Sequence, residues 1–360
     1  MAQFTNLLIL VIAIHILSTW LMAFRRGLSA RTRPIPVFSL NEQPLISILI
    51  PAWNEHTVLA HALMALQASD YSNWEAIVIA GGTDDTEEYA RQLCKNLAQF
   101  TIIHQTPLGK NAALNLGLAQ AQGEIIVLLD ADTNVNHDWL ANIVAPITNG
   151  MDAVTGNYFP KVQTWVSTLV GIEKVSAYLV HNNVTLNGCA GIALSRQLIM
   201  KIGGFPEAVT VGVDFDLDRR VKSLGIQPIF ASTAHAKTER AYTLQDYWRT
   251  ELRWRRAHLQ NIFRHQEWVG LLFYVNAFAF YLAPFAIFSS WWELWPLLWS
   301  WILFRRLSLS IETITYDRTW SKYAWVPIML LPVDFLIGLA AFVTQRRNII
   351  LFKGSRPMEG

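Results

Sequence analysis

The feature that most constrains the fold is an alternation of strand and helix signals that begins at Leu45. Short apolar runs rich in branched residues occur at 45–50, 74–80, 100–104 and 125–129. Segments with helical spacing separate them, at 56–68, 86–97 and 110–121. Because parallel strands need crossover connections of this length, the pattern predicts an α/β domain with a mostly parallel sheet and helices on both faces.

Two carboxylates follow the last of these runs. Asp130 and Asp132 stand one residue apart, directly after Ile125–Leu129. Ligands of open α/β sheets bind just beyond the carboxyl ends of the strands. Paired acids there suit a hard divalent cation, Mg²⁺ or Mn²⁺, that is itself held to a phosphate. An ordinary acidic turn is the alternative, and the short motif alone leaves both open. Gly81-Gly82, after the second run, is equally open between a nucleotide-contacting loop and a tight turn.

The composition and the N-terminus point to a membrane. Hydrophobic residues make up 52% of the chain and charged residues 16%, which is typical of a membrane-attached protein, and the net charge of +2 does not favour a nucleic-acid partner. Phe4–Phe24 is uncharged and long enough to cross a bilayer. Its basic residues follow the apolar run, which favours a retained anchor over a cleaved signal peptide. These residues, Arg25, Arg26, Arg31 and Arg33, predict that the chain from residue 25 onward lies on the cytosolic side of a bacterial-type inner or plasma membrane.

The C-terminal third contains further apolar segments. Residues 269–288 and 323–344 are expected to span the membrane. The segment 291–304, stopped by Arg305-Arg306, is short for a span and could be re-entrant or interfacial, which leaves the side of the C-terminus open. Asp334 lies inside the last span, where a carboxylate is expected to pair or to face the protein interior.

A helix predicted over 243–264 has two distinct ridges. One is apolar and consists of Leu244, Tyr247, Trp248, Leu252, Leu259, Ile262 and Phe263. The other consists of Arg249, Arg253 and Arg256. This pairing is typical of a helix lying in a membrane surface, and the arginines could face lipid headgroups or hold a diphosphate.

The two cysteines, Cys94 and Cys189, lie far apart in the chain. They indicate neither a disulfide framework nor a zinc site, and they are expected to be small buried side chains.

Five motifs occur in an order that resembles the membrane-bound family 2 glycosyltransferases, whose catalytic domain has the GT-A fold. They are Gly109 to Gly117, Gly123-Glu124, Asp130 to Thr133, Gly203-Gly204-Phe205 before an acidic helix, and Arg253-Trp254.

The resemblance implies a donor site at the strand ends. The nucleotide would be held by Pro51, Ala52, Trp53, Glu55, Asp84, Lys110 and Asp130. Asp132 would coordinate the Mn²⁺ or Mg²⁺ that bridges the diphosphate of a nucleotide-sugar. The cation would neutralise the charge that grows on the leaving nucleotide.

The resemblance also implies an acceptor site. Asp214 matches the family's catalytic base, which takes the proton of the acceptor hydroxyl. Arg253 would contact the diphosphate, and Trp254 would form the floor of the acceptor site. The acceptor site would also be lined by Gly188, Cys189 and Ala190.

The chain departs from the family pattern at three places. Ile79 and Ala80 stand where many members have paired aspartates, one of which reads uracil, so a UDP-sugar is only the first choice of donor. Val213 replaces the glutamate before the base, and Thr250 replaces the glutamine of the Gln-x-x-Arg-Trp signature. That signature is associated with processive synthesis, and its erosion disfavours a polysaccharide synthase.

We therefore expect an inverting, metal-dependent enzyme that moves a sugar, glucose by preference, onto a membrane lipid. A small processive polysaccharide synthase is the alternative, and a non-catalytic membrane adaptor is the least favoured reading. The sequence does not specify the acceptor lipid or the oligomeric state. The expected organisation is an anchor at 1–24, a linker at 25–44, a GT-A domain at 45–242, an interface helix at 243–266, a membrane region at 267–345 and a basic tail at 346–360.

Overall fold

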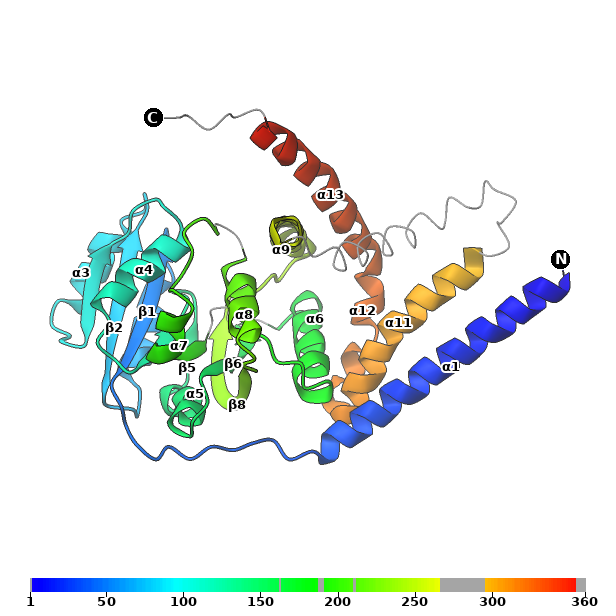
Figure 1. The fold of residues 1–360 in the computed structure, drawn as a ribbon, viewed down its shortest axis with the longest axis horizontal. Helices are drawn as coiled ribbons and strands as arrows, with labels where there is room; N and C mark the ends of the chain where they lie inside the picture. The colour runs from blue at the N-terminus through cyan, green and yellow to red at the C-terminus, as the bar shows by residue number, and fades with distance from the viewer. Residues whose placement is uncertain (1, 162, 187–190, 210–211, 266–294, 354–360) are drawn as a thin grey trace. The chain divides into compact units, whose positions relative to one another are not determined.

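The structure, a computed structural model, describes residues 2–161, 163–186, 191–209, 212–265 and 295–353 (Figure 1). The chain forms two compact units. The helical unit comprises residues 1–33, 163–183 and 241–360, and the sheet unit comprises 34–162 and 184–240. Residues 163–183, which the expected organisation placed in the GT-A domain, thus belong to the helical unit.

The first half of the sheet unit follows the predicted alternation. Its strands are β1 (Ile46–Trp53), β2 (Trp74–Gly81), β3 (Phe100–His104) and β4 (Ile125–Leu128). They pair in parallel in the order β3-β2-β1-β4, with Ile46 of β1 opposite both Trp74 and Ile125. The connecting helices are α2 (Leu59–Gln67), α3 (Thr86–Cys94) and α4 (Lys110–Gln120). The α/β prediction is confirmed for this half.

The second half of the sheet is mixed, and the prediction of a mostly parallel sheet does not extend to it. Its order is β7-β6-β8-β5, and β7 pairs antiparallel with β4. The β6–β7 and β5–β8 pairs are also antiparallel, whereas β6–β8 is parallel. The strands are β5 (Asn134–Val135), β6 (Ala153–Pro160), β7 (Ile192–Ser195) and β8 (Ile229–Thr238). The sequence indicated neither β8, which is rich in small and polar residues, nor α5 (Trp139–Thr148).

Helices cover both faces of this sheet. Alternate residues of β1 point to opposite sides, with Ile48 and Ile50 in one core cluster and Leu49 in the other. The first cluster includes side chains of α2, α3 and α5, and the second includes side chains of α4, α7 (Arg196–Lys201) and α8 (Val213–Ser223). Cys94 is buried in the first cluster, as predicted. Burial of each such aliphatic side chain contributes roughly 1.5–3 kcal/mol, so these clusters fix the strand ends that carry the candidate site.

Among the described residues, the helical unit contains α-helices and two short irregular helices. Its elements are α1 (Ala2–Thr32), α6 (Trp165–Lys174), a π-helix η1 (Val175–Val180), α9 (Leu244–His265), α11 (Trp295–Tyr316), a 3-10 helix η4 (Arg318–Tyr323), α12 (Val326–Met329) and α13 (Leu331–Lys353). α1 continues past the expected end of the anchor, and α11 runs through Arg305-Arg306 without stopping. The predicted last span is broken between α12 and α13 rather than being one helix.

The membrane spans themselves are not established by this geometry. Within the described ranges, no single helix meets the length and apolarity that a bilayer crossing requires. Arg318–Met329 and Leu331–Ala341 satisfy the requirement only as a pair, bent by 43° at their junction. The predicted span at 269–288 lies outside the described residues.

Two buried carboxylates of the helical unit are compensated by several partners each. Asp334 accepts hydrogen bonds from Arg306 at 2.7 Å, Arg255 at 2.9 Å and the hydroxyl of Tyr247 at 2.7 Å. Glu312 is paired with Arg26 of α1, and it lies 2.8 Å from the Ser176 hydroxyl and 3.0 Å from His181 Nε2. The expectation that Asp334 would pair inside the protein is confirmed.

The apolar ridge of α9 has a protein partner. Tyr247 belongs to a core cluster with Leu169 of α6 and with Leu330 and Ile337 near α13, and Trp248 and Leu252 pack against it. This packing holds α9 in the helical unit.

Candidate active site

The parallel strands β1, β2 and β4 end at one edge of the sheet, and their loops bind one another there. The amide of Asn54, after β1, donates to the carbonyl of Gly81 at 3.1 Å. The Asn54 side-chain oxygen in turn accepts the amide of Thr83 at 2.7 Å. Gly82 has a φ of +122°, and a Cβ there would lie 2.1 Å from the same oxygen. The glycine pair is therefore explained by close packing of the β2 loop on the β1 loop.

Asp84 lies in that packed loop. Its carboxylate accepts hydrogen bonds from the amide and the hydroxyl of Thr86 and, at 3.2 Å, from the amide of His56. The Thr86 hydroxyl also accepts the amide of Glu55 at 2.9 Å. Asp84 thus ties the start of α3 to the loop after β1, beside the predicted donor residues Pro51, Ala52, Trp53 and Glu55.

Lys110 and Asp130 lie together, as the motif order implied. The Lys110 ammonium is 2.6 Å from Asp130 Oδ1, and both side chains are about one-third exposed. Lys110 is the first residue of α4 and follows Gly109, whose φ of +92° suits glycine. The sharp entry to this helix brings a residue distant in sequence onto the end of β4.

Asp132 is held by two hydroxyl groups. Its Oδ1 accepts hydrogen bonds from Thr133 at 3.2 Å and from Thr238, at the end of β8, at 3.1 Å. Burial and the neighbouring Asp130 raise the pKa of Asp132, against the opposing effects of these hydrogen bonds and of Arg240. The carboxylate is thus oriented, but its negative charge is unfavourable in this setting.

Glu55 also lies among negatively charged side chains. Burial raises its pKa from 4.5 to about 7, with further contributions from Asp132, Asp130 and Asp84. Lys110 acts in the opposite direction. A cation bound at this edge would remove part of the repulsion.

The donor set fits a substrate-borne divalent cation. In the part of the chain that the structure describes, no three acidic, histidine or cysteine side chains converge as a resident metal site would require. Mg²⁺ is commonly bound through one or two carboxylates together with substrate phosphates and water. Asp132, oriented on one oxygen and surrounded by other acids, fits that pattern.

Asp214 lies in the first turn of α8, directly after Gly212 with a φ of +71°. The two acids that follow on the helix have partners of their own. Asp216 pairs with Arg220 at 2.8 Å, and Asp218 accepts the amide of Leu186 at 2.8 Å. The contacts of Asp216 and Asp218 are therefore with other parts of the fold.

Arg253 and Trp254 belong to α9 of the helical unit, where both are exposed. Arg256, a member of the predicted arginine ridge, and its neighbour Arg255 bind within the helical unit. Arg255 pairs with Asp334, and Arg256 donates to the Thr344 hydroxyl at 2.9 Å, so these two hold α9 to α13. The predicted acceptor residues Gly188, Cys189 and Ala190 lie outside the described residues.

Sequence reasoning missed two contributors to the Asp132 environment. Thr238 and Arg240 both come at the end of β8. The Arg240 guanidinium lies 4.6 Å from the centre of the Tyr158 ring. No local motif marks either residue. β5 follows Asp132 closely in the chain, and its pairing with β8 brings these two residues near Asp132.

Comparisons with known proteins agree with this geometry. The model of glycosyl transferase family 2 matches residues 47–187, and that of glycosyl transferase family group 2 matches residues 125–343. Glycosyltransferase AglE of Haloferax volcanii is 26% identical over 52% of this chain and 64% of its own length. A beta-monoglucosyldiacylglycerol synthase of Nostoc is 32% identical over 58% of this chain and 50% of its own length. The chain thus spans about half to two thirds of these relatives.

The fold has a solved counterpart. The mannosyltransferase PcManGT from Pyrobaculum calidifontis, solved in complex with GDP-Man and Mn²⁺, superposes with a TM-score of 0.58 at 19% identity. The superposition covers 93% of this chain and 97% of the other. The similarity therefore shows a shared fold, of GT-A type in the sheet unit.

Proposed function

The chain belongs to glycosyl transferase family group 2, and from that premise we propose that it transfers a sugar from a nucleotide-sugar onto a membrane lipid. The observation that carries the proposal is the cluster at the sheet edge. There Lys110 pairs with Asp130, two threonine hydroxyls orient Asp132, and the pKa values of Asp132 and Glu55 are raised.

The donor side is assigned by charge and position. Lys110 and Asp130 bind the nucleotide, with Trp53 and Glu55 beside its base and ribose. Asp132 would hold the divalent cation, which would supply electrostatic stabilisation of the leaving diphosphate. Arg253, whose planar guanidinium suits a diphosphate, is assigned to it by the match to the family motif alone.

The transfer is a single displacement at the anomeric carbon. The acceptor oxygen forms a bond to that carbon, while the bond from the carbon to the diphosphate oxygen breaks and the nucleoside diphosphate leaves. Asp214 takes the proton of the acceptor hydroxyl, and the configuration inverts. Trp254 lies under the acceptor.

The donor proposal is UDP-glucose first. Relatives named as beta-monoglucosyldiacylglycerol synthases support a glucosyl group, and the neighbour solved with GDP-Man makes a guanine nucleotide the second choice. Ala80 stands where an aspartate would read uracil, so the base must be recognised by other groups.

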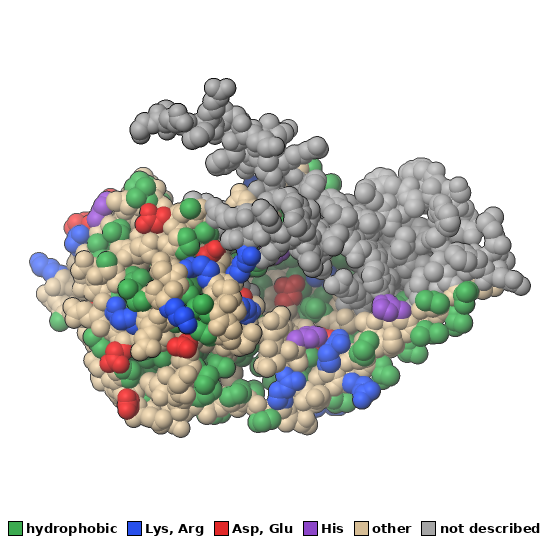
Figure 2. Space-filling view, in the orientation of Figure 1, with side chains coloured by type: hydrophobic (Ala, Val, Ile, Leu, Met, Phe, Trp, Pro, Cys, Tyr) green, Lys and Arg blue, Asp and Glu red, His purple; other side chains and the backbone are tan. Residues whose placement is uncertain are grey.

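The lipid acceptor and the membrane location are supported by the helical unit. α1 exposes large apolar side chains along most of its length, and Figure 2 shows hydrophobic side chains on its visible face. They are Leu7, Leu10, Val11, Ile14, Leu17, Leu21, Met22, Phe24 and Leu28. Such a surface is unusual for a helix in water and suits lipid contact. With the arginines after residue 24, it supports a cytosolic sheet unit.

The test is a transfer assay with purified full-length protein, Mn²⁺, a lipid extract and radiolabelled UDP-glucose or GDP-mannose. We expect label in an organic-extractable product, and a loss of about 10²–10⁴-fold in Asp214→Asn, the range of a general base. High-mass water-soluble product alone would favour a processive synthase. No turnover of any nucleotide-sugar would favour a non-catalytic adaptor.

A further inference from the structure

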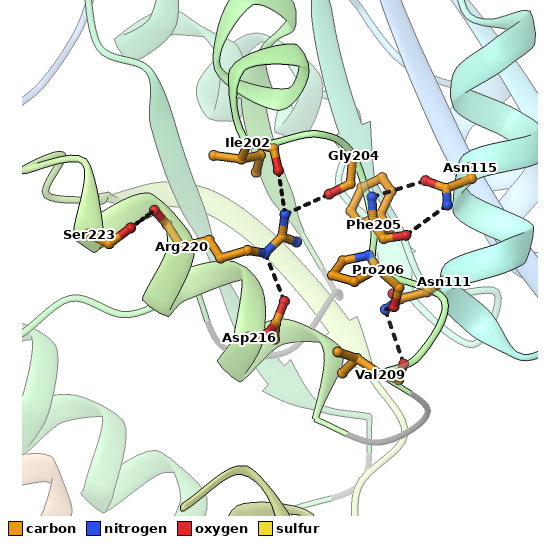
Figure 3. Close-up of polar contacts among 10 residues, drawn as sticks. All are labelled: Asn111, Asn115, Ile202, Gly204, Phe205, Pro206, Val209, Asp216, Arg220 and Ser223. Atoms are coloured by element: carbon orange, nitrogen blue, oxygen red, sulfur yellow. Dashed lines mark hydrogen bonds and ion pairs between the residues drawn. The ribbon is translucent and has the colours of Figure 1, made fainter. Parts of the chain in front are cut away.

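The segment 202–209, here called the GGF loop, joins α7 to α8 and lies between α8 and α4 (Figure 3). Gly203 and Gly204 have φ values of +74° and +70°. Phe205 is 2% exposed and anchors the loop in the core cluster that also contains Leu114 of α4 and Leu217 of α8. The loop is therefore a fixed part of the sheet unit.

α4 holds one side of the loop through two asparagines one helical turn apart. The Asn115 side chain donates to the carbonyl of Phe205 at 2.7 Å and accepts its amide at 3.0 Å. Asn111 is 3% exposed and donates to the carbonyls of Pro206 at 2.7 Å and Val209 at 3.1 Å. An amide side chain that binds both groups of one residue fixes its orientation as well as its distance.

α8 holds the other side through one arginine. Arg220 donates from one terminal nitrogen to the carbonyls of Ile202 at 2.9 Å and Gly204 at 2.8 Å. Its Nε donates to Asp216 at 2.8 Å, which orients the guanidinium (Figure 3). The left-handed conformation of the two glycines lets these carbonyls converge on a single cation.

These contacts connect the two sides of the proposed reaction. The helix that carries Asn115 begins at Lys110, which is bonded to Asp130. The helix that carries Arg220 has Asp214 in its first turn. The GGF loop touches both helices through buried or half-buried polar groups.

We propose that Asn115 and Arg220 are positioning residues, which act through the GGF loop to set Asp214 at its working distance from the donor held by Lys110 and Asp130. This inference rests on the proposed role of Asp214 as the base. Neither residue is among those proposed to bind the donor or the acceptor, so their loss should leave the donor site intact and displace the base. A misplacement of about 1 Å in a reacting group can lower turnover by about 100-fold.

The experiment compares Arg220→Ala, Asn115→Ala and the matched control Ser223→Ala in the full-length protein. Ser223 donates to the backbone carbonyl of Arg220 and makes no contact with the loop in Figure 3. Turnover is divided by the number of sites that bind Mn²⁺ and UDP or GDP, so that partly unfolded protein does not count. We expect kcat per site to fall about 10- to 100-fold in the first two variants, with donor KM within about threefold of wild type. The control should retain wild-type kcat.

A double-mutant cycle with Asp214→Asn distinguishes this proposal from the proposed function. If Arg220 acts through Asp214, Arg220→Ala should lower kcat by less than about twofold further in the Asp214→Asn background. Arg220→Lys, which can still reach one carbonyl, should recover part of the lost kcat. An equal loss in both backgrounds, or wild-type kcat per site in both Arg220→Ala and Asn115→Ala, would overturn the positioning role and leave the proposed function standing. Wild-type kcat in Asp214→Asn would overturn the proposed base and the positioning role with it.

Discussion

The carboxylates of the helical unit and those at the sheet edge have opposite electrostatic settings. Asp334 and Glu312 are buried and each binds at least two cationic or hydrogen-bonding partners. At the sheet edge, Glu55 and Asp132 are partly exposed, and burial together with the charge of neighbouring aspartates raises the pKa of each. The carboxylates of the helical unit stabilise the folded chain without a ligand. The second group is arranged for a cation that comes with the substrate.

Acids that stabilise the fold can therefore be distinguished from acids that bind a ligand by the charge of their neighbours. A buried acid with its charge balanced by arginines contributes to packing, and its removal leaves those arginines uncompensated. An acid that is oriented by hydroxyl groups but lies beside other acids is destabilised by charge repulsion. A bound cation would reduce that repulsion. Substitutions in the two groups should therefore affect stability and activity in opposite ways.

The largest effect is expected for Asp334→Asn. Arg255 and Arg306 would then face a neutral amide inside the helical unit, and breaking a buried ion pair costs about 3–5 kcal/mol. Thermal unfolding of the full-length protein in detergent should show a lower midpoint for this unit. A midpoint equal to that of wild type would show that the network is not structural.

Asp132→Asn should reverse that pattern. Because burial and Asp130 disfavour its negative charge, the variant should be as stable as wild type, or slightly more so, without metal. Its sugar transfer should fall by about 10²–10³-fold, the usual loss when one group that stabilises developing charge is removed. The assay is transfer at saturating Mn²⁺, with Asp138→Asn, an acid outside the cluster, as the control. Loss of stability with retained transfer would place Asp132 among the structural acids.

A smaller, pH-dependent effect is expected from Glu55. Its pKa is 4.5 when unfolded and about 7 when folded, so the folded protein binds this proton more tightly. Its contribution to stability therefore falls as the pH rises from about 4.5 to 7 and is constant above that. In metal-free protein the unfolding midpoint should decrease over this range, and Mn²⁺ should raise the midpoint more at pH 8 than at pH 5.5.

The control for that prediction is Glu55→Gln. It should remove part of the decrease with pH. An unchanged pH profile in this variant would show that Glu55 is not the titrating group.

The smallest effect is expected for Arg91→Ala. Arg91 pairs with Glu87 one turn earlier on α3 at 2.7 Å, on an exposed surface outside both carboxylate groups. Such helical surface pairs contribute about 0.3–0.5 kcal/mol. Chemical unfolding and the transfer assay should both stay close to wild type. A loss above about 1 kcal/mol would show that this pair contributes more than an exposed surface pair does.

Local sequence patterns were sufficient for the first half of the sheet. Each strand from β1 to β4 is an apolar run that ends in a turn signal, so periodicity located the edge where Lys110 meets Asp130. The contact of those two residues followed from the motif order. The burial of Asp334 with partners also followed, because an acid in an apolar segment has few alternatives.

Patterns failed where long-range pairing decides the structure. β8 has small and polar residues because its environment comes from β6 and β5, so neither Thr238 nor Arg240 could be assigned to Asp132. The antiparallel pairing of β7 with β4 is likewise a tertiary choice. Arg255 and Arg256 follow directly on the Arg253-Trp254 motif in sequence, but α13 supplies their partners, and helical spacing alone does not show this.

The most direct test of the central claim is calorimetry of nucleotide binding to the full-length protein. UDP and GDP would each be titrated with Mn²⁺ and with EDTA, into wild type and Asp132→Asn. We expect at least one nucleotide to bind wild type with Mn²⁺, and its affinity to fall at least about tenfold with EDTA and in the variant, a difference of about 1.4 kcal/mol. Equal affinity under all these conditions would contradict a cation site built on Asp132.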